Sequence, residues 1–289
     1  MKRTPWISHI VIGCACLLCI IPFWAIIAIS LTSESFIRKE GYSLLLPSID
    51  FSAYKYVLNN ASDIIHAYGV TAAQAFLGTF FSVIIMALLA YSLSRENYSR
   101  RNALSFMLFF TMLFSGGLVP SYILISQYLH LRDSFWVYIF PSLLSPFHVI
   151  LLRTFFQQIP NELRESAKLD GCSELRIFWQ IVLPLSKPSI ATVALLQLLA
   201  RWNDWNTCLL YIDNQELITL QYLLQRIILN VELVKENMMN LPMNISLKDL
   251  PGESMRMVMV IVSAGPMMLV FPFFQKYFAK GLTVGAVKG

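Results

Sequence analysis

The residues best able to do chemistry in this sequence are few and scattered. Three of the five cysteines, Cys14, Cys16 and Cys19, lie close together in an apolar run, but no histidine or carboxylate joins them at ligand spacing. The four histidines are dispersed, and no His-Glu-x-x-His, Gly-x-Ser-x-Gly or Gly-x-x-x-x-Gly-Lys-Ser/Thr motif occurs. The sequence therefore predicts no metal site, disulfide framework or catalytic centre. We interpret the cysteines as small residues of a lipid-facing helix.

A stretch at 160–188 is rich in charge and offers binding chemistry instead. Pro160 suits the start of a helix, and Gly171 suits the left-handed residue that ends one. Ser173 can then cap a second short helix, which Pro184 stops. Apolar residues recur at helical spacing, namely Leu163, Ala167, Leu175, Phe178, Trp179 and Val182. The pattern predicts a helix–Gly–helix elbow whose apolar stripe packs on the protein while its charges face a partner, or else an ordinary amphipathic hairpin at a membrane surface.

The composition shows which environment must hold this elbow. Of 289 residues, 56% are hydrophobic and only 13% are charged, and the mean hydropathy is +0.60. A soluble domain carries about 25% charged residues, so too few charges remain here to cover a water-facing surface. The net charge of +5 does not indicate a nucleic-acid partner, because the aromatic residues lie inside apolar runs rather than among basic ones. The chain is predicted to be an integral membrane protein.

Apolar runs of the length that crosses a bilayer predict six transmembrane helices in an all-α fold. The six spans are 7–31, 68–93, 103–126, 134–153, 185–211 and 255–275. The first follows Lys2 and Arg3, but it is too long for a signal peptide, so we expect an uncleaved anchor helix, kinked or tilted near Pro22. The simplest domain count is one membrane domain over 1–289, with a core at 68–275.

Basic residues set the predicted orientation. With the N-terminus in the cytoplasm, the inside segments carry 13 Lys and Arg, the outside segments carry 8, and Arg201 falls within the fifth span. Both termini are therefore expected inside, with a cytoplasmic loop at 154–184, an extracellular loop at 212–254 and a cytoplasmic tail at 276–289. The outside loop contains a predicted amphipathic helix at 217–224.

The elbow carries a motif that resembles the coupling motif of ABC importer permeases. It reads Glu165-Ser166-Ala167-x-x-Asp170-Gly171, then nine residues, then Ile181-x-Leu183-Pro184. The family pattern is Glu-Ala-Ala-x-x-x-Gly-(x)9-Ile-x-Leu-Pro. Ser166 departs from it by one small residue for another, and Cys172 stands where alanine is usual. The match covers some 20 residues in the expected loop.

Further stretches are similar to the carbohydrate branch of that family, the maltose-type importers that depend on a binding protein. They are Phe114–Pro120, Asp133–Trp136, Arg153–Phe156, Arg201–Trp205 and the ending Lys280–Gly289. The Gly-Gly-Leu-x-Pro pattern at 116–120 resembles the sub-branch that handles complex oligosaccharides. The resemblance therefore covers most of the chain.

The resemblance implies a type I importer permease that is not an enzyme. The chain would pair with a second, homologous permease, two copies of a cytoplasmic ATPase that hold ATP and Mg²⁺, and an extracellular sugar-binding protein. It would bind no cofactor of its own. It would work in the bilayer of a bacterial plasma membrane, and the abundance of Ile and Leu indicates a low-GC, Gram-positive bacterium.

The same resemblance assigns the candidate site residues. The residues expected to couple to the ATPase are Glu165, Ser166, Ala167, Asp170, Gly171, Ile181, Leu183 and Pro184. The tail residues expected at the interface between the ATPases are Gly281, Leu282, Thr283, Gly285, Lys288 and Gly289, in a thin extended strand. The residues expected along the translocation path are Gly116, Gly117, Pro120, Trp202 and Asn203.

Alternatives remain open at several of these positions. Trp202 and Trp205 are typical of membrane-interface anchors, Arg201 and Asp204 can form a local ion pair, and the breaks at 116–120 also suit close helix packing. For the whole chain, the alternatives are an ion-coupled secondary transporter and an ABC permease for a solute other than a sugar. The span interiors lack Asp, Glu and Lys, which argues against ion coupling.

Overall fold

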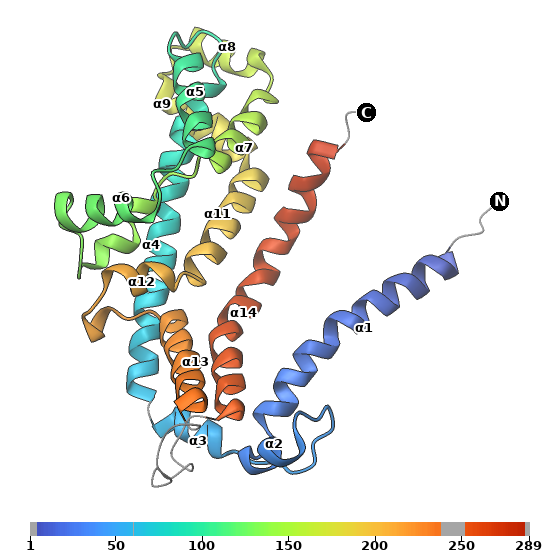
Figure 1. Ribbon diagram of the computed structural model, residues 1–289. Coiled ribbons are helices and arrows are strands. Elements are labelled where there is room, and N and C mark those ends of the chain that lie inside the picture. Colours follow the sequence, from blue (N-terminus) through green and yellow to red (C-terminus); the bar gives the residue numbers. More distant parts are fainter. Residues whose placement is uncertain (1–4, 60, 238–251, 287–289) are drawn as a thin grey trace. The chain divides into compact units, whose positions relative to one another are not determined.

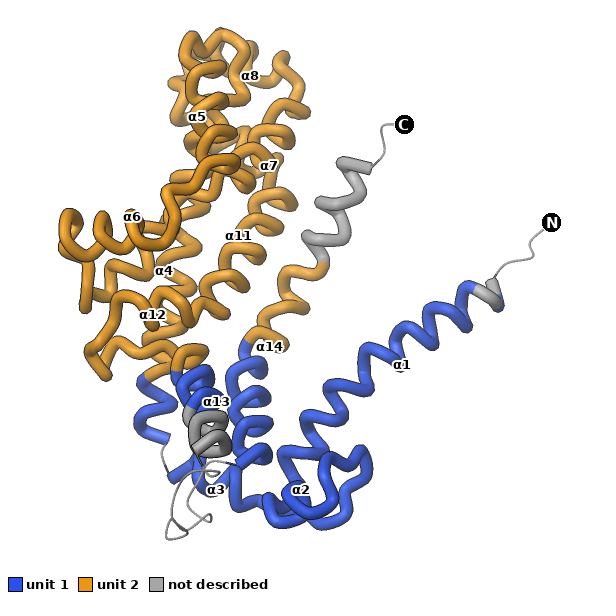
Figure 2. Tube along the Cα trace, viewed as in Figure 1, with its two compact units in different colours: residues 1–66, 223–266 blue, residues 67–222, 267–289 orange. Residues whose placement is uncertain are grey.

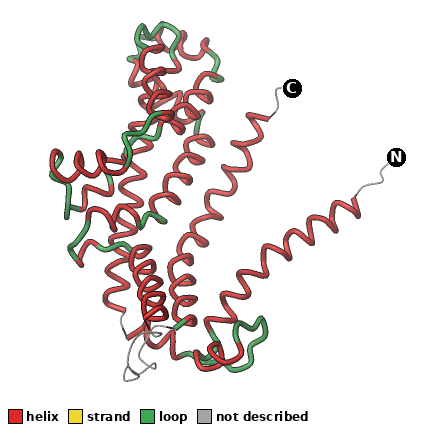
Figure 3. The backbone as a smooth tube through the Cα atoms, in the orientation of Figure 1, coloured by secondary structure: helices red, strands yellow, loops and turns green. Residues whose placement is uncertain are grey.

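The computed structural model describes residues 5–59, 61–237 and 252–286. Within these ranges the chain is helical, and the rest of the described backbone is turns and loops (Figure 3). The all-α prediction is therefore confirmed for the described part of the chain. This outcome follows from the bilayer, where a helix satisfies its own backbone hydrogen bonds.

The helices are labelled in Figure 1, with 3-10 and π turns denoted η. In chain order they are α1 Pro5–Ser30, α2 Glu34–Glu40, α3 Ser52–Asn59, α4 Ala61–Ser94, α5 Arg101–Leu113, α6 Leu118–Ile123, η1 Leu124–Tyr128, η2 Phe135–Tyr138, η3 Phe140–Ser142, α7 Pro146–Gln157, α8 Asn161–Leu169, α9 Glu174–Ile177, η4 Phe178–Val182, α10 Leu183–Leu185, α11 Lys187–Trp202, α12 Asn206–Tyr211, η5 Gln215–Leu217, α13 Leu220–Asn237 and α14 Glu253–Ala286.

The chain divides into two compact units (Figure 2). The first comprises residues 1–66 and 223–266, and the second comprises residues 67–222 and 267–289. All the residues predicted to couple to the ATPase and all those predicted along the translocation path lie in the second unit. The two units are described separately below.

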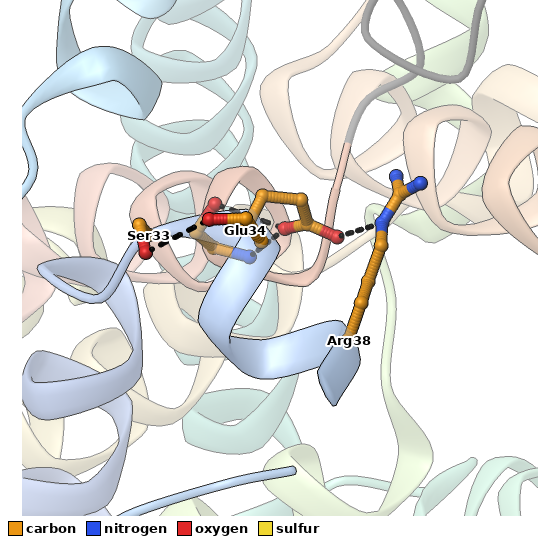
Figure 4. Close-up of polar contacts among 5 residues, drawn as sticks. Ser33, Glu34 and Arg38 are labelled. Atoms are coloured by element: carbon orange, nitrogen blue, oxygen red, sulfur yellow. Dashed lines mark hydrogen bonds and ion pairs between the residues drawn. The ribbon is translucent and has the colours of Figure 1, made fainter. Parts of the chain in front are cut away.

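In the first unit, a carboxylate caps the start of α14. Glu34, at the first position of α2, accepts hydrogen bonds from the backbone N and the Oγ of Ser254, at 3.3 and 3.2 Å. The same carboxylate pairs with Arg38 one turn along α2, at 3.2 Å (Figure 4). A negative charge is favourable at this end of a helix. Gly252 leaves room for it, because a Cβ there would overlap the Glu34 carboxylate.

The second unit is organised around one apolar core between α4, α7 and the α9–α11 segment. Met86, Ala90 and Leu93 of α4 are buried against Val149, Leu152 and Phe156 of α7 and against Phe178, Val182 and Val193 of the later helices. Small and large side chains alternate across this seam, which allows the helices to approach closely. The core lies next to the elbow and therefore supports it.

The predicted spans are confirmed as apolar segments but not as six continuous helices. Three helices, Ser8–Ser30, Ala61–Ser94 and Glu253–Gln275, are long and apolar enough to cross a bilayer. Three further segments pass the same test only as bent pairs, and these are Arg101–Leu113 with Leu118–Tyr128, Phe135–Ser142 with Pro146–Gln157, and Glu174–Leu185 with Lys187–Trp202. Their bends are 115°, 51° and 83°.

The breaks that the sequence indicates in spans three and four, at 116–120 and near Pro141 and Pro146, are therefore confirmed, whereas the bend in span five was missed. Gly117 has a φ of +89°, which a helix cannot contain, and it ends the run begun by α5. Pro146 and Pro188 stand in the first turns of α7 and α11, where a missing N–H costs nothing, so each starts a new helix. Hydropathy averages over such breaks and does not detect them.

Two other boundaries also differ from prediction. The amphipathic helix expected at 217–224 begins at Leu220 and extends to Asn237 as α13. The tail expected to be extended is instead helical through Ala286, because α14 continues past the predicted end at 275. Lys288 and Gly289 lie outside the described residues.

Candidate functional site

The elbow turns where the sequence predicts. The backbone N–H groups of Gly171 and Cys172 donate to the carbonyls of Lys168 and Ala167, at 3.0 and 2.9 Å. Gly171 has a φ of +77°, so the prediction of a left-handed glycine is confirmed. The Oγ of Ser173 accepts a hydrogen bond from the backbone of Arg176, so the predicted cap of the second helix is also confirmed.

The second arm of the elbow does not stop at Pro184 as predicted. It passes from α9 through the π turn η4 and reaches Ser186, which separates α10 from α11. Pro184 lies in the first turn of α10. The wider hydrogen bonding of a π turn changes the register of the helix just before this proline. The sharp bend therefore lies two residues beyond the motif's proline.

The buried face of the elbow differs from the predicted stripe. Ala167, Phe178 and Val182 are buried as expected, but Leu163, Leu175 and Trp179 are exposed. The buried face includes a charged residue instead, Arg164, which is only 2% exposed. Its guanidinium donates to the backbone carbonyls of Phe156 and Ile159, at 2.5 and 3.5 Å, where α7 ends.

Arg164 is thus a residue that sequence reasoning missed. The last carbonyls of a helix have no partner within the helix, and a cation is favourable there. Burial lowers the pKa of the Arg164 guanidinium, and the nearby charge of Arg95 acts in the same direction. Arginine nevertheless keeps its proton in proteins, so this group stays a cation.

Glu174 fastens the elbow to the core. It accepts from the hydroxyl of Tyr91 on α4 at 2.5 Å and pairs with Lys168 of the opposite arm at 2.7 Å. Arg95, just after α4, lies 3.5 Å away. Burial acts to raise the pKa of Glu174, but the hydrogen bonds from Lys168 and Tyr91 and the charges of Arg95 and Lys168 outweigh it and leave the pKa below its ordinary value. The two arms are therefore held together and tied to α4.

The outer face of the elbow carries four of the eight residues of the coupling motif. Glu165, Ser166, Asp170 and Gly171 are exposed, and Leu169 beside them is 89% exposed. Within the described residues, the Glu165 carboxylate has no hydrogen-bond partner. The remaining motif residues belong to the other side or to the second arm, since Ala167 is buried, Ile181 and Leu183 are partly buried and Pro184 is exposed. A charged and apolar surface thus projects from a rigid support.

The residues predicted along the translocation path lie away from the elbow and differ in their exposure. Gly116, Gly117 and Pro120 lie at the break between α5 and α6 and are exposed. Asn203 is exposed after α11, but Trp202 is buried, and its ring packs 6.3 Å from that of Tyr68. The anchor interpretation is therefore wrong for Trp202, whose side chain fills the interior of the unit. The tail residues Gly281, Leu282, Thr283 and Gly285 lie in the last turns of α14.

Arg201 is the centre of a buried polar network in the second unit. Its guanidinium donates to the carbonyls of Tyr138 and Ser142, both at 2.8 Å, and to the hydroxyl of Ser82 at 2.7 Å. The Arg201 carbonyl accepts from the Gln74 amide at 2.6 Å. The ion pair with Asp204 that the sequence allows does not form, because Asp204 accepts from Thr207 instead. Arg201 thereby joins α4 and α11 to the irregular η2–η3 segment.

Gly78 on α4 makes room for this network and provides a test of it. A Cβ at Gly78 would lie 2.6 Å from Cζ and 2.9 Å from Nε of Arg201, whereas a Cβ at Gly69 on the same helix would meet nothing within 4 Å. We expect Gly78→Ala to cost about 1–3 kcal/mol through overpacking. Gly69→Ala is expected to be neutral or to stabilise by up to about 1 kcal/mol. Thermal unfolding of the two purified variants measures this, and equal midpoints would show that the network tolerates displacement.

A polar cavity beside η2–η3 was also missed from the sequence. It has a volume of about 320 Å³ and lies between α6, η1, the η2–η3 segment and α12. The lining residues that carry a hydroxyl or an amide are Ser121, Ser142, Asn206, Thr207 and Tyr211. Only the break at 116–120 pointed to this region, because the residues that close the cavity come from segments about 85 positions apart in the chain.

Comparison with known proteins places these features in a family. Residues 69–284 match the family described as "Binding-protein-dependent transport system inner membrane component". The polygalacturonan/rhamnogalacturonan transport system permease protein YtcP of Bacillus subtilis is 37% identical over 274 residues, which is 94% of each chain. The arabinooligosaccharides transport system permease protein AraQ of the same species is 29% identical over 277 residues, covering 94% of this chain and 92% of AraQ.

A solved structure agrees with these sequence matches. It is a chain of a bacterial ABC transporter involved in the import of the acidic polysaccharide alginate. The match has a TM-score of 0.79 and 30% sequence identity, and it covers 94% of this chain and 95% of the other. Sequence and fold therefore point to the same group of membrane proteins.

Proposed function

The chain belongs to the family of inner-membrane components of binding-protein-dependent transport systems, and from this premise we propose that it is the permease subunit of an ATP-driven importer of oligosaccharides. Permeases of this family are not catalytic, and ATP hydrolysis takes place on a separate chain. The similarity to YtcP, to AraQ and to the alginate importer supports a glycan of several sugar units as the solute. YtcP and the alginate importer further favour a fragment of a polysaccharide that contains uronic acids.

The proposed complex holds this chain together with a second, homologous permease, two copies of a cytoplasmic ATPase and an extracellular sugar-binding protein. ATP and Mg²⁺ belong to the ATPase. In the proposed topology each bent pair counts as one span, which gives six spans and puts both termini on the same side of the membrane. The excess of 13 basic residues inside over 8 outside supports the cytoplasmic side for both. The membrane is the plasma membrane of a bacterium, and we propose a Gram-positive one.

The outward face of the elbow is the observation that carries this proposal. Glu165 and Leu169 project from a short helix on a face that the described part of the chain leaves exposed. The elbow also exposes Leu163, Leu175 and Trp179, and several exposed large apolar side chains on one short segment are typical of a surface that another protein covers. In our proposal that protein is the ATPase, and Gly281 to Gly289 of the tail add a second contact with it. An exposed ion pair adds little affinity, so Glu165 sets the register of docking.

Movement of the elbow reaches the membrane through rigid contacts. Arg164 ties α8 to the end of α7, and Glu174 ties α9 to Tyr91 on α4. The second arm continues into α11 with a bend at Ser186. A pull on the elbow by the closing ATPases therefore shifts α4, α7 and α11 together rather than bending the loop. Switching of a transporter between its two open states requires such a rigid-body movement.

ATP-driven uptake by the reconstituted complex tests the proposal. The full complex is placed in proteoliposomes with the binding protein outside and ATP inside, and uptake of trigalacturonate, arabinotriose and maltotriose is measured. We expect at least one of them to accumulate only when ATP is present. Uptake that proceeds without ATP and follows a sodium or proton gradient would instead support a secondary transporter. Uptake of none of the three would contradict the proposed solute class.

A further inference from the structure

Two arginines meet between α5 and α7, at the ends of these helices that the proposed topology places on the cytoplasmic side. Arg101 is the first residue of α5, and Arg153 lies near the end of α7, which packs against α5 (Figure 1). Nη1 of Arg153 donates to the hydroxyl of Ser105 at 3.0 Å, and this hydroxyl donates to the carbonyl of Arg101 at 2.7 Å. Among the described residues, neither arginine forms an ion pair. Ser105 therefore lies between two cationic residues that lack a counter-ion there.

The two guanidinium groups are partly enclosed and still have donors to offer. The Nε atom of each is buried and has no hydrogen-bond partner within the described chain. The side chain of Arg101 makes no hydrogen bond to any described residue, and its terminal nitrogens are not enclosed, so a ligand can reach them. Arg101 and Arg153 lie close enough for their positive charges to repel each other. An anion that bridges them would remove this repulsion.

The surface next to the arginines shows what kind of anion fits. The planar fork of a guanidinium matches the oxygens of a phosphate group. Beyond the arginines, α5 exposes large apolar side chains at the spacing of one helix face, and these are Phe106, Phe109, Phe110 and Leu113. The site thus has a cationic end at the membrane surface and an apolar stripe that continues along the span. A phospholipid has the same division between headgroup and acyl chains, whereas a free phosphate ion would leave the stripe unused.

We propose that Arg101 and Arg153 bind the phosphate of an anionic phospholipid of the cytoplasmic leaflet, whose acyl chains lie along the apolar stripe of α5. Basic pockets between transmembrane helices on this side of a membrane bind anionic headgroups. A zwitterionic lipid binds less well, because its own cation would lie beside two arginines. The bound lipid supports the end of α7, to which Arg164 of the elbow is hydrogen-bonded. The inference goes beyond the proposed function and uses only its topology.

Binding of labelled dioleoyl-phosphatidylglycerol to the purified full chain in neutral detergent micelles tests this site. We expect the chain to bind it at least about tenfold more tightly than dioleoyl-phosphatidylcholine. Arg101→Gln and Arg153→Gln should each lower the affinity for phosphatidylglycerol about tenfold, the value of one hydrogen bond to a charged group. The matched control is Arg100→Gln, which removes the same charge from the exposed residue just before α5. This variant should keep the wild-type affinity.

Arg101→Gln keeps the test independent of folding, because the Arg101 side chain makes no hydrogen bond in the described chain, and its unfolding midpoint should equal that of the wild type. Equal affinity for the two lipids overturns the site, and so does an affinity of Arg101→Gln no lower than that of Arg100→Gln. Displacement of the labelled lipid by millimolar inorganic phosphate overturns the assignment to a lipid. Loss of the bound lipid when the complete complex assembles overturns it as well, because a partner chain then supplies the anion. ATP-driven uptake is measured separately, so the proposed function stands or falls on its own.

Discussion

Replacing Arg201 by methionine is expected to destabilise the chain by about 2–5 kcal/mol. The side chain is only 4% exposed and supplies donors to Tyr138, Ser142 and Ser82. Methionine fills similar space but donates nothing, so the carbonyls of Tyr138 and Ser142 and the hydroxyl of Ser82 lose the arginine donors, at about 1–3 kcal/mol for each buried acceptor left under-satisfied. Each carbonyl keeps one longer hydrogen bond, from the hydroxyl of Ser142 and of Ser82 respectively. Removing the cost of burying a charge offsets part of this loss. Thermal unfolding of the purified chain should show a midpoint lower by roughly 5–10 °C.

An exposed arginine provides the matched control. Arg132 pairs with Asp213 at the surface, where its side chain is half exposed. Arg132→Met makes the same chemical change without burial, and we expect its unfolding midpoint to stay at the wild-type value. If Arg201→Met and Arg132→Met unfold at the same temperature, the Arg201 network does not hold the η2–η3 segment in place.

Replacing Glu165 by lysine is expected to abolish the coupling between sugar binding and ATP hydrolysis. The carboxylate is exposed and has no partner in the described chain, so the change should not affect unfolding. The substitution places a positive charge at a position where the proposed ATPase surface is complementary to a negative one. Like charges across an interface lower affinity and specificity. We expect ATPase activity stimulated by the binding protein to fall at least tenfold in the reconstituted complex.

Glu162 on the same helix separates a specific role from a general charge effect. It is also exposed and lies one turn before Glu165 in α8. Glu162→Lys alters the net charge identically, and we expect it to retain most of the stimulated activity. Similar losses for both variants would mean that only the overall charge of the elbow matters. Full activity in Glu165→Lys would remove this residue from the coupling surface.

Local signals in the sequence were sufficient to predict several parts of the fold. The scarcity of charge predicted a membrane protein, and the family match confirms it. Gly171 and Ser173 adopt the conformations expected of them because a left-handed turn and a helix cap depend on a few neighbouring residues. The exposed position of Glu165 likewise follows from its place on a short amphipathic helix.

Features that depend on distant residues were missed. Arg164 is buried because the end of α7 offers it carbonyls, and Arg201 finds carbonyls of η2–η3 in place of Asp204. Trp202 is buried because Tyr68 of another helix packs against it. The bend of the fifth span at Ser186 was also missed, whereas the breaks in the third and fourth spans lie where glycine and proline indicate them. Composition and periodicity carry no information about such partners.

Site-specific photo-crosslinking at Leu169 tests the central claim most directly. Leu169 projects from the elbow, and Leu45 in the first unit is a comparably exposed leucine that the proposed topology places outside the cell. A photoreactive amino acid at either position is activated in membranes that contain the complete complex. The account predicts an adduct between position 169 and a separate ATPase chain, and none from position 45. Absence of an ATPase adduct at 169, or its appearance at 45, would contradict the assignment of the elbow as the cytoplasmic coupling surface.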